Sequence, residues 1–359
     1  MLKQRIIKSI SILLGAALAL SLTVFPSFAA VIFGDANGDG AVMADDARII
    51  LRASVGLDTP TADKRTMDVD GNGEIGAEDA RLVLRYSVGL ETVFPAEPPI
   101  LQLEVGASSA LLYDVQAEKT VFAKNTARTS APASITKLLT ALTALEYCSE
   151  DTVMTVGNEI DLIGEDSSVC YVRKGWRASL KTILSGMLTA SGNDAAYTVA
   201  VNVMRKGHTY LSDRDAVNAF VEKMNLKAKE LGMTHSRFVN PDGYDAAGQY
   251  TTAEDILLLA IAASNNPTVM RICGTYRLTA YLANGTDLTF YNTNRLLNPK
   301  DKYYSPLVNG LKTGSTPDAG LCITVTFSKN GRQYIAVVLG AATDDARYTS
   351  VHTMMNAVG

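Results

Sequence analysis

The chain has 359 residues, which is enough for two or three domains. Its hydrophobic fraction of 47% and charged fraction of 19% are typical of a globular protein with a sizeable core, and they exclude a largely disordered chain. The formal net charge of −4 at pH 7 argues against nucleic acid as a partner, because phosphate binding needs a basic surface.

Residues 1–30 have the pattern of a secretory signal peptide. A basic segment, MLKQRIIK, precedes the apolar run SISILLGAALALSLTV, and the sequence Ser27-Phe28-Ala29 predicts cleavage after Ala29 or Ala30. The apolar run is shorter than the ~20 residues that span a bilayer, so we expect release rather than an uncleaved membrane anchor. No later stretch is apolar enough to span. Without the three basic residues of the leader, the mature chain has a net charge of about −7.

Segments 34–57 and 67–90 are an internal repeat. The first reads GDANGDGAVMADDARIILRASVGL and the second reads MDVDGNGEIGAEDARLVLRYSVGL. Each copy is predicted to be a loop followed by a helix, in which apolar residues recur at helical spacing and a glycine marks the C-terminal end. These residues are Ala47, Ile50, Leu51 and Gly56 in the first copy and Ala80, Val83, Leu84 and Gly89 in the second.

Each loop of the repeat places oxygen-bearing side chains at the spacing of a calcium-binding loop. Positions 1, 3, 5 and 12 carry acids or amides, position 6 is a glycine that permits a sharp turn, and the carbonyl at position 7 is expected to point inward. The alternative is an acidic turn ahead of a helix N-cap, which the tandem repetition disfavours. The predicted ligands are Asp35, Asn37, Asp39, Ala41 and Asp46 in the first loop and Asp68, Asp70, Asn72, Glu74 and Asp79 in the second.

A duplicated loop and helix with aspartate at position 12 resembles a type I dockerin, and the resemblance covers residues 34–90. It implies a small all-α unit that binds two structural calcium ions and docks onto a cohesin module of a cell-surface scaffold. In the family, partner choice depends largely on loop positions 10 and 11 and on the exposed helix face. The corresponding residues are Ala44, Asp45, Ala77 and Glu78, with Arg48, Arg52, Arg81 and Arg85 on the helices. Because the two copies are nearly equivalent, the resemblance implies that either can meet the partner after a half-turn.

The segment ETVFPAEPPILQLEV contains Pro95, Pro98 and Pro99, which block helix formation and stiffen the chain. We place the domain boundary in this segment. The predicted organisation is a signal peptide over residues 1–30, a dockerin over 31–91, a linker over 92–106 and a second domain over 107–359.

From residue 107 onward, predicted strands stand at both ends of the domain and predicted helices lie between them. A hairpin is predicted at residues 108–116 with 120–125 and an amphipathic helix at 132–148. Helical stretches follow within residues 179–204 and 216–233. Strand patterns return at residues 274–282, 285–294, 322–330 and 333–342. Asn330-Gly331 predicts a tight turn between the last two strands. This order predicts an α+β fold in which helices pack on an antiparallel sheet.

Ser134-Ile135-Thr136-Lys137 is the first of three motifs with chemical potential. It follows Pro132, which can start a helix, so Ser134 and Lys137 are expected on one helix face within hydrogen-bond range. A serine hydroxyl needs a base to take its proton, and a lysine whose pKa is lowered by burial and nearby cations can do so. Alone, the pair is more often explained by a helix-capping serine.

The second motif, Ser191-Gly192-Asn193, lies between two predicted helical stretches. A loop there can carry a hydroxyl that relays protons and an amide that holds a substrate carbonyl. By itself the motif is only a turn sequence.

The third motif, Lys312-Thr313-Gly314, leads into a predicted strand whose edge can pair with an extended peptide. Gly314 would leave room for the peptide, and Lys312 and Thr313 would face its terminal carboxylate. The charge of Lys312 would also help to keep Lys137 deprotonated. The backbone N–H groups of Ser134 and Ser315 are candidate oxyanion donors.

Together the three motifs resemble the penicillin-binding protein and serine β-lactamase superfamily. The sequences PASITKLLTA, SGNDAA, KTGSTPDAG and LGMTHSRFVNPDGY are most similar to the low-molecular-mass D-alanyl-D-alanine carboxypeptidases, peptidase family S11. The resemblance implies an αβα sandwich with a β-lactamase/transpeptidase-like antiparallel sheet and a helical subdomain. It implies a serine-type carboxypeptidase that removes the terminal D-alanine from peptidoglycan stem peptides through an acyl-serine intermediate. The resemblance implies no cofactor for catalysis, and acylation by β-lactam antibiotics.

Two features depart from the family pattern. Many members have a β-rich domain and an amphipathic membrane helix after the catalytic core, whereas this sequence ends at Gly359, soon after the last predicted strand. We expect the dockerin to replace that anchor and to hold a secreted enzyme at the cell surface or cell wall. Members often have Asn-Pro-His-Gly where this chain has Asn240-Pro241-Asp242-Gly243, so any role of that histidine is not carried over.

Three alternatives stay open. A Ser-His-Asp hydrolase is disfavoured because no histidine lies in a nucleophile-elbow context. A class A β-lactamase shares the motif order but has Ser-Asp-Asn at the second motif. A non-catalytic wall-binding module would retain the fold without turnover.

The cysteines lie far apart in the sequence and form no C-x-x-C pair, so a zinc site is disfavoured. Export would permit disulfides, with three connectivities for complete pairing, but buried free thiols are the favoured interpretation. The residues are Cys148, Cys170, Cys273 and Cys322.

Overall fold

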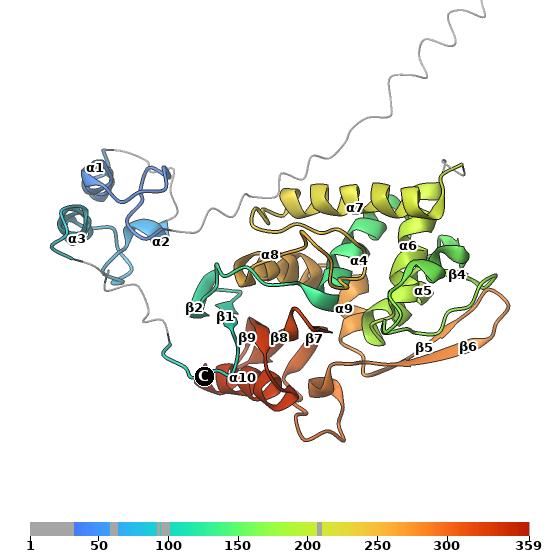
Figure 1. The fold of residues 1–359 in the computed structure, drawn as a ribbon. Coiled ribbons are helices and arrows are strands. Elements are labelled where there is room, and N and C mark those ends of the chain that lie inside the picture. The colour runs from blue at the N-terminus through green and yellow to red at the C-terminus, as the bar shows by residue number, and fades with distance from the viewer. Residues whose placement is uncertain (1–31, 58–63, 92–93, 95–100, 207–209, 359) are drawn as a thin grey trace, which may run out of the picture. The chain divides into compact units, whose positions relative to one another are not determined.

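The computed structural model describes residues 32–57, 64–91, 94, 101–206 and 210–358. The predicted signal peptide lies outside the described residues. The chain divides into two compact units, Met1–Glu97 and Pro98–Gly359, and each unit has hydrophobic core residues of its own (Figure 1).

The first unit is built on the two copies of the repeat. Helices α1 (Ala44–Ser54), α2 (Lys64–Met67) and α3 (Ala77–Ser87) surround a small core to which both copies contribute apolar side chains. Gly56 and Gly89 follow α1 and α3 with φ angles of 70° and 75°, as expected of glycines at the C-terminal ends of helices. The two predicted loop-helix units are confirmed, and α2 is an additional turn between them.

Two details of this unit differ from the sequence prediction. Leu51 and Leu84 fit the apolar spacing but are 47% and 49% exposed, because other residues of the same helices fill the core. Phe94, predicted to lie in the linker, is buried and stacks on Tyr86 with ring centroids 4.7 Å apart. The packed unit therefore extends beyond residue 91.

A five-stranded antiparallel sheet forms the centre of the second unit, with the strand order β2-β1-β9-β8-β7 (Figure 1). Asn330 and Gly331 join β8 to β9 with φ angles of 51° and 78°, which suit a two-residue turn. The hairpins predicted at the two ends of the domain are confirmed, and they share one sheet because β1 pairs with β9. The strands are β1 (Ser109–Asp114), β2 (Lys119–Lys124), β7 (Val308–Thr316), β8 (Gly320–Lys329) and β9 (Arg332–Ala341).

Helices cover both faces of the sheet, which confirms the predicted α+β fold. Helix α10 (Asp344–Ala357) packs on one face and α8 (Ala253–Ser264) packs on the other, while α4 (Thr136–Tyr147) lies among the helices beyond α8. The remaining helices are η1 (Ala133–Ile135), η2 (Asn158–Leu162), α5 (Leu180–Thr189), α6 (Asn193–Arg205), α7 (Asp213–Glu230), α9 (Pro267–Cys273) and η3 (Arg295–Leu297). Two small sheets pair β3 (Val153–Thr155) with β4 (Arg177–Ser179) and β5 (Arg277–Tyr281) with β6 (Asp287–Tyr291).

Three parts of this unit differ from the sequence prediction. Helix α4, predicted to be amphipathic, is buried from Thr136 to Ala144, because helices α5 to α9 surround it. The strands predicted at 274–282 and 285–294 form a separate two-stranded ribbon, not part of the main sheet. Val105, predicted to lie in the linker, is buried in the core beneath α10.

Within the described residues, no individual helix combines the length and apolar character needed to cross a membrane. Helices α8 and α9 pass that test only as a pair, and they meet at a bend of 101°. All four cysteines are buried and free, as the sequence analysis favoured.

Candidate active site

Ser134 and Lys137 lie where a sharp turn runs into α4. Ala133 precedes the serine, is fully buried and has a φ angle of 46°, a strained value for a residue with a Cβ. The turn η1 then places Ser134 one helical turn before Lys137, whose Nζ donates a hydrogen bond to Ser134 Oγ at 2.8 Å. The contact expected from the S-x-x-K spacing is therefore present.

The segment from Asn240 to Gly243 packs directly against this nucleophile turn. Asn240 Oδ1 accepts a hydrogen bond from Gly243 N at 2.9 Å, which closes the segment into a turn. A Cβ at position 243 would lie 1.8 Å from Ala133 O, so the close approach of the two turns requires glycine. The approach brings the Asp242 carbonyl within 2.7 Å of Lys137 Nζ, which donates to it.

Lys137 has no solvent-exposed surface. Burial lowers the pKa of its amine to about 8, while the nearby acids Asp242 and Asp194 oppose that fall. A pKa of about 8 leaves roughly a tenth of the amine neutral at pH 7. Part of the Lys137 population is therefore already neutral near pH 7 and can take a proton from Ser134, with no need for strongly alkaline pH.

Ser191 and Lys312 form a second hydroxyl-amine pair. Ser191 has a φ angle of 62° just before α6, and Lys312 Nζ, on β7, donates to Ser191 Oγ at 3.0 Å and to Thr313 O at 2.9 Å. Burial, followed by the charges of Lys137 and Arg347, holds the pKa of Lys312 well below its usual range. The Ser191 hydroxyl thus contacts an amine that can exchange protons with it.

Asn193 is the first residue of α6. Its Nδ2 donates to Ser167 Oγ at 2.9 Å, and its Oδ1 is buried with no hydrogen-bond partner within the described part of the chain. The neighbouring Asp194 accepts hydrogen bonds from Cys170 N and Val172 N, both at 3.0 Å, and so holds the preceding loop against α6. The expectation that the Asn193 amide holds a substrate carbonyl stays a prediction.

Gly314, on β7, lies against the nucleophile turn. A Cβ at this position would be 2.9 Å from Ala133 Cβ and 3.1 Å from Ser134 N. The K-T-G motif predicts that this glycine leaves room for a substrate, but a Cβ here would first collide with the nucleophile turn of the chain itself. Ser315 follows and is exposed, so the two candidate oxyanion donors, Ser134 N and Ser315 N, lie on neighbouring segments.

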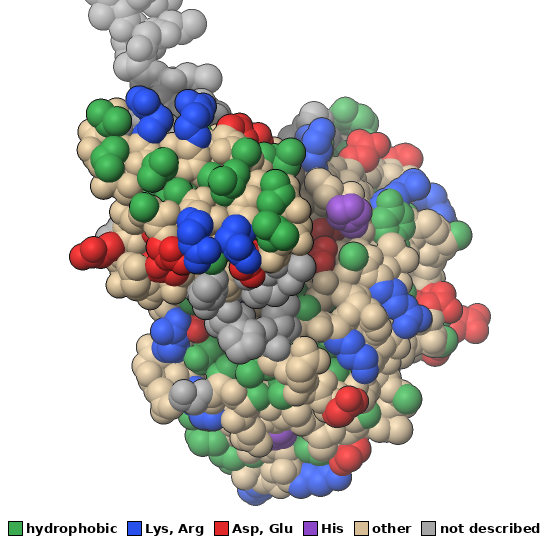
Figure 2. All heavy atoms as spheres, turned by 90° about the vertical axis from the view of Figure 1, so that its left-hand side faces the viewer, with side chains coloured by type: hydrophobic (Ala, Val, Ile, Leu, Met, Phe, Trp, Pro, Cys, Tyr) green, Lys and Arg blue, Asp and Glu red, His purple; other side chains and the backbone are tan. Residues whose placement is uncertain are grey.

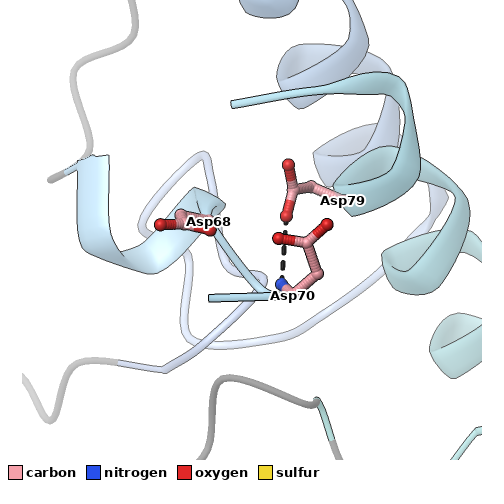
Figure 3. Close-up of side chains that lie close together, drawn as sticks. All are labelled: Asp68, Asp70 and Asp79. Atoms are coloured by element: carbon pink, nitrogen blue, oxygen red, sulfur yellow. Dashed lines mark hydrogen bonds between the residues drawn. The ribbon is translucent and has the colours of Figure 1, made fainter. Parts of the chain in front are cut away.

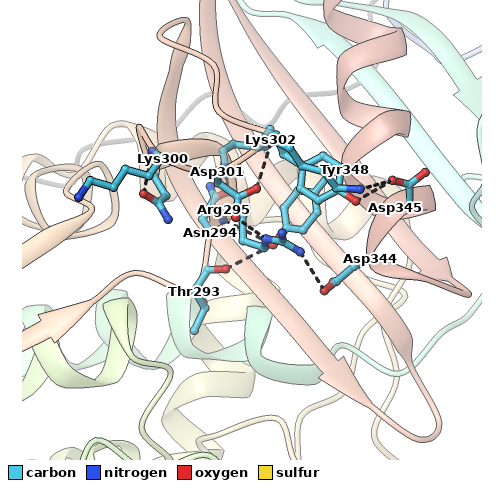
Figure 4. A network of polar contacts seen from close by, with 12 residues as sticks. Thr293, Asn294, Arg295, Lys300, Asp301, Lys302, Asp344, Asp345 and Tyr348 are labelled. Atoms are coloured by element: carbon cyan, nitrogen blue, oxygen red, sulfur yellow. Dashed lines mark hydrogen bonds and ion pairs between the residues drawn. The ribbon is translucent and has the colours of Figure 1, made fainter.

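Thr313 contacts a polar network that the sequence did not predict. Its Oγ1 lies 2.5 Å from Thr293 Oγ1, and Tyr348 OH donates to Thr293 O at 3.3 Å. Arg295 pairs with Asp301 and stacks over the Tyr348 ring (Figure 4). The network ties this segment to α10 and restricts the position of Thr313.

Arg347 is a second feature near β7 that the sequence analysis missed. Its guanidinium is buried, and Nη1 donates long hydrogen bonds of 3.4 Å to Gly314 O and Cys322 O. Its Nε is buried with no hydrogen-bond partner among the residues described. No local motif marks this arginine, because its proximity to Gly314 arises only when α10 packs on the sheet.

The second loop of the first unit brings three carboxylates together. Asp68, Asp70 and Asp79 each contribute an oxygen, and these atoms lie within 4.8 Å of one another (Figure 3). Asp79 is buried and accepts from Asp70 N at 3.1 Å and Gly76 N at 2.7 Å. Asp68 Oδ1 is buried and has no hydrogen-bond partner in the described structure. A hard cation would satisfy that oxygen and offset the repulsion of three acids, so the donor set fits calcium.

The first loop arranges its side chains differently. Asp46 is buried and accepts from Ala36 N at 2.9 Å and Met43 N at 2.8 Å, and Asn37 Nδ2 donates to Asp39 Oδ2 at 3.0 Å. Among the described residues, only the second loop forms a close group of three acids. All the predicted ligands stay predictions: Asp35, Asn37, Asp39, Ala41 and Asp46 in the first loop, and Asn72 and Glu74 together with the three converging acids in the second.

The outer surface of the first unit carries exposed apolar residues from both copies of the repeat. Figure 2 shows apolar side chains grouped between lysine and arginine side chains on this unit. Three exposed apolar residues of the first copy each have an equivalent in the second. The set comprises Leu51, Val55, Leu57, Leu84, Val88 and Leu90.

Comparison with known proteins gives two family matches and several relatives. Residues 93–343 match the peptidase S11 family, described as D-alanyl-D-alanine carboxypeptidase, and residues 33–86 match the dockerin type I domain. The D-alanyl-D-alanine carboxypeptidase DacF of Bacillus subtilis is 34% identical over 258 residues, which are 70% of this chain and 61% of that protein. DacC of Escherichia coli is 29% identical over 74% of this chain and 64% of its own length. The chain thus spans less than two thirds of the length of these curated relatives.

Solved structures show the same fold. The DD-transpeptidase of Streptomyces K15 is 25% identical with a TM-score of 0.64, and the match covers 72% of this chain and 98% of that one. Penicillin-binding protein D2 from Listeria monocytogenes, in its ampicillin-bound form, is 28% identical with a TM-score of 0.59 and the same coverage. The chain therefore belongs to the S11 family of D-alanyl-D-alanine carboxypeptidases, and a segment that matches a type I dockerin precedes its S11 region.

Proposed function

We propose that the chain is a serine-type D-alanyl-D-alanine carboxypeptidase that acts on peptidoglycan stem peptides through an acyl-serine intermediate. The observation that carries the proposal is the 2.8 Å contact between Ser134 Oγ and the buried amine of Lys137. The second pair, Ser191 and Lys312, supplies a separate route for the proton. Membership of the S11 family supports the substrate class.

In the acylation step, neutral Lys137 keeps one N–H on the Asp242 carbonyl and turns its lone pair toward the Ser134 hydroxyl. Lys137 takes the serine proton as Oγ attacks the carbonyl carbon of the penultimate D-alanine. We assign stabilisation of the resulting oxyanion to the backbone N–H groups of Ser134 and Ser315. General-base catalysis of this kind contributes about 10²–10⁴ in rate.

In the next step, the peptide C–N bond breaks and D-alanine leaves once its nitrogen has taken a proton. We assign that proton transfer to Ser191, with Lys312 holding its hydroxyl. In this assignment Ser191 gives its proton to the nitrogen and regains one that derives from the Lys137 ammonium, which leaves Lys137 neutral again. A water molecule then attacks the acyl-serine ester, and the neutral Lys137 accepts a proton from it. As the ester C–O bond breaks, Lys137 returns this proton to Ser134 Oγ, and the shortened peptide leaves.

Strand β7 supports the proposed binding of an extended peptide, because it is an edge strand of the main sheet. This edge has hydrogen-bond donors and positive charge that suit the terminal carboxylate of the substrate. They come from Lys312, Thr313 and Arg347. Gly314 keeps the strand close to Ser134, and Asn193 is proposed to hold a polar group of the stem peptide.

Two assays on the full chain test this proposal. A fluorescent penicillin should label the wild-type protein covalently and leave S134A unlabelled, because a β-lactam acylates the same serine. A diacyl-D-alanyl-D-alanine peptide should release free D-alanine. Labelling that persists in S134A would reject the acyl-serine mechanism.

The same assays separate the alternatives. Rapid turnover of a chromogenic cephalosporin without release of D-alanine would indicate a β-lactamase. Absence of both labelling and D-alanine release in a folded protein would indicate a non-catalytic wall-binding module.

For the first unit, we propose two structural calcium ions and docking onto a cohesin module of a scaffold, which holds the secreted enzyme at the cell surface or cell wall. The three converging acids and the unpaired oxygen of Asp68 support the second site. Calorimetric titration with calcium, followed by a panel of cohesins, tests the proposal. A chain that gains no stability with calcium and binds no cohesin would contradict it.

A further inference from the structure

The carboxyl group of Asp242 lies in an environment that its neighbours do not fully satisfy. The residue is 1% exposed, Oδ1 accepts from Tyr244 N at 3.1 Å, and Oδ2 is buried with no hydrogen-bond partner in the described part of the chain. The backbone carbonyl of the same residue accepts from Lys137 Nζ. An unpaired buried carboxylate costs free energy unless a bound proton or a nearby positive charge offsets its charge.

Lys137 is the cation that acts on this carboxyl group, and Asp242 is the acid with the largest effect on Lys137. Asp194 also acts on Lys137, but backbone N–H groups of the preceding loop already satisfy its carboxylate. The titratable groups around the pair, from α6, β7 and the adjoining loops, are Asp194, Cys170, Tyr197, Tyr244 and Lys312.

We propose that the carboxyl group of Asp242 sets the pH range over which Lys137 activates Ser134. In its ionised form the carboxylate favours the ammonium form of Lys137, which cannot act as a base. Asp242 is thus a positioning residue that acts through Lys137 and shifts acylation toward alkaline pH. The inference rests on the proposed function, because it takes Lys137 as the base.

The direction of the expected pH shift follows from the effects that Asp242 and Lys137 have on each other's pKa. Burial raises the pKa of Asp242 while Lys137 lowers it, and burial lowers the pKa of Lys137 to about 8 while Asp242 raises it. Replacing Asp242 by asparagine removes the charge but keeps a carbonyl that can accept from Tyr244 N. The pKa of Lys137 then falls, and the acid limb of the acylation profile moves to lower pH. At a pH well below the pKa of Lys137, the neutral fraction of the amine rises about tenfold when the pKa falls by about 1.

The test is the rate at which a fluorescent penicillin labels the full chain between about pH 5 and pH 10. The variants are D242N and the matched control D245N, which removes a carboxylate from the same segment that accepts from Asp318 N at 2.9 Å. We expect D242N to be labelled about three- to tenfold faster than the wild type near pH 6 and equally fast near pH 10. D245N should follow the wild-type profile.

A folded D242N whose acid limb coincides with that of the wild type overturns the inference, and so does an equal shift in D245N. If D242N loses its thermal unfolding transition, D242H takes its place, because a neutral imidazole carries no negative charge that would favour the ammonium form of Lys137. The acid limb of D242H should then also lie below that of the wild type. Absence of labelling in the wild type at every pH rejects the proposed function, not the role of Asp242.

Discussion

The two candidate sites are built in opposite ways. In the first unit, the acids proposed to hold calcium lie in short continuous loops, and several of them accept N–H groups of their own loop. In the second unit, the site draws on three segments far apart in the sequence, and both of its lysines are buried. The first segment carries Ser134 and Lys137, the second Ser191 and the third Lys312. The first site is local and partly open to solvent, whereas the second exists only when the whole unit has folded.

The two sites differ in what offsets their unfavourable charge, which is the repulsion of carboxylates in the first unit and the burial of lysine amines in the second. A cation from solvent can offset the repulsion of the acids in the calcium loops. No ion from solvent reaches Lys137 or Lys312, so burial instead lowers the pKa of each amine. We propose that this desolvation is the source of reactivity at the second site. We therefore expect changes there to alter activity far more than stability, and changes in the loops to do the reverse.

The largest effect on activity is expected from K137M. Removing the base should lower the rate of penicillin labelling by about 10³, while the unfolding midpoint stays the same or rises because an apolar side chain replaces a buried amine. Labelling kinetics and thermal unfolding of the full chain measure both. K181M is the matched control, since Lys181 is half-exposed and pairs with Asp151 at 2.8 Å. Labelling of K137M within threefold of the wild type would contradict the role of Lys137.

An intermediate effect is expected from G314A. The added Cβ would meet Ala133 Cβ at 2.9 Å and Ser134 N at 3.1 Å, so the nucleophile turn must move. Because small displacements of reacting groups cost up to about 10² in rate, labelling should fall about tenfold to a hundredfold.

G331A is the control for this substitution. Gly331 also has a positive φ angle, but a Cβ there would meet nothing within 4 Å. The change should cost about 1–2 kcal/mol of stability and leave labelling unchanged. Equal labelling of G314A and G331A would show that the contact with the nucleophile turn has no kinetic role.

The features that could be predicted from the sequence alone are formed by residues that lie close together along the chain. The spacing of Ser134 and Lys137 predicts their contact because one helical turn joins them, and Asn330-Gly331 predicts its hairpin for a similar reason. The resemblance to a known family supplied the grouping of the three distant motifs. Composition and periodicity alone would not bring Lys312 to Ser191.

The features that were missed depend on packing between distant segments. Arg347 lies near Gly314 only because α10 packs on the sheet, and Thr293 reaches Thr313 from the segment before β7. Helix α4 was wrongly predicted to be amphipathic, since its sequence does not reveal that other elements cover every side from Thr136 to Ala144. The sequence also does not predict the unpaired carboxyl oxygen of Asp242, because its surroundings depend on how the 240–243 segment packs against the nucleophile turn.

The smallest effect on activity is expected from removal of calcium, which should affect the first unit alone. A ligand at about 100 times its Kd adds about 2.7 kcal/mol to the free energy of unfolding of the unit that binds it. Calorimetry of the full chain with calcium and with a chelator should therefore shift one transition, while penicillin labelling stays constant. D79A should lose most of that shift, because Asp79 is the buried member of the three converging acids, whereas D287A on β6 should retain it. Slower labelling after calcium is removed would mean that the two units are energetically coupled. The calcium loops of the first unit would then support the candidate active site of the second.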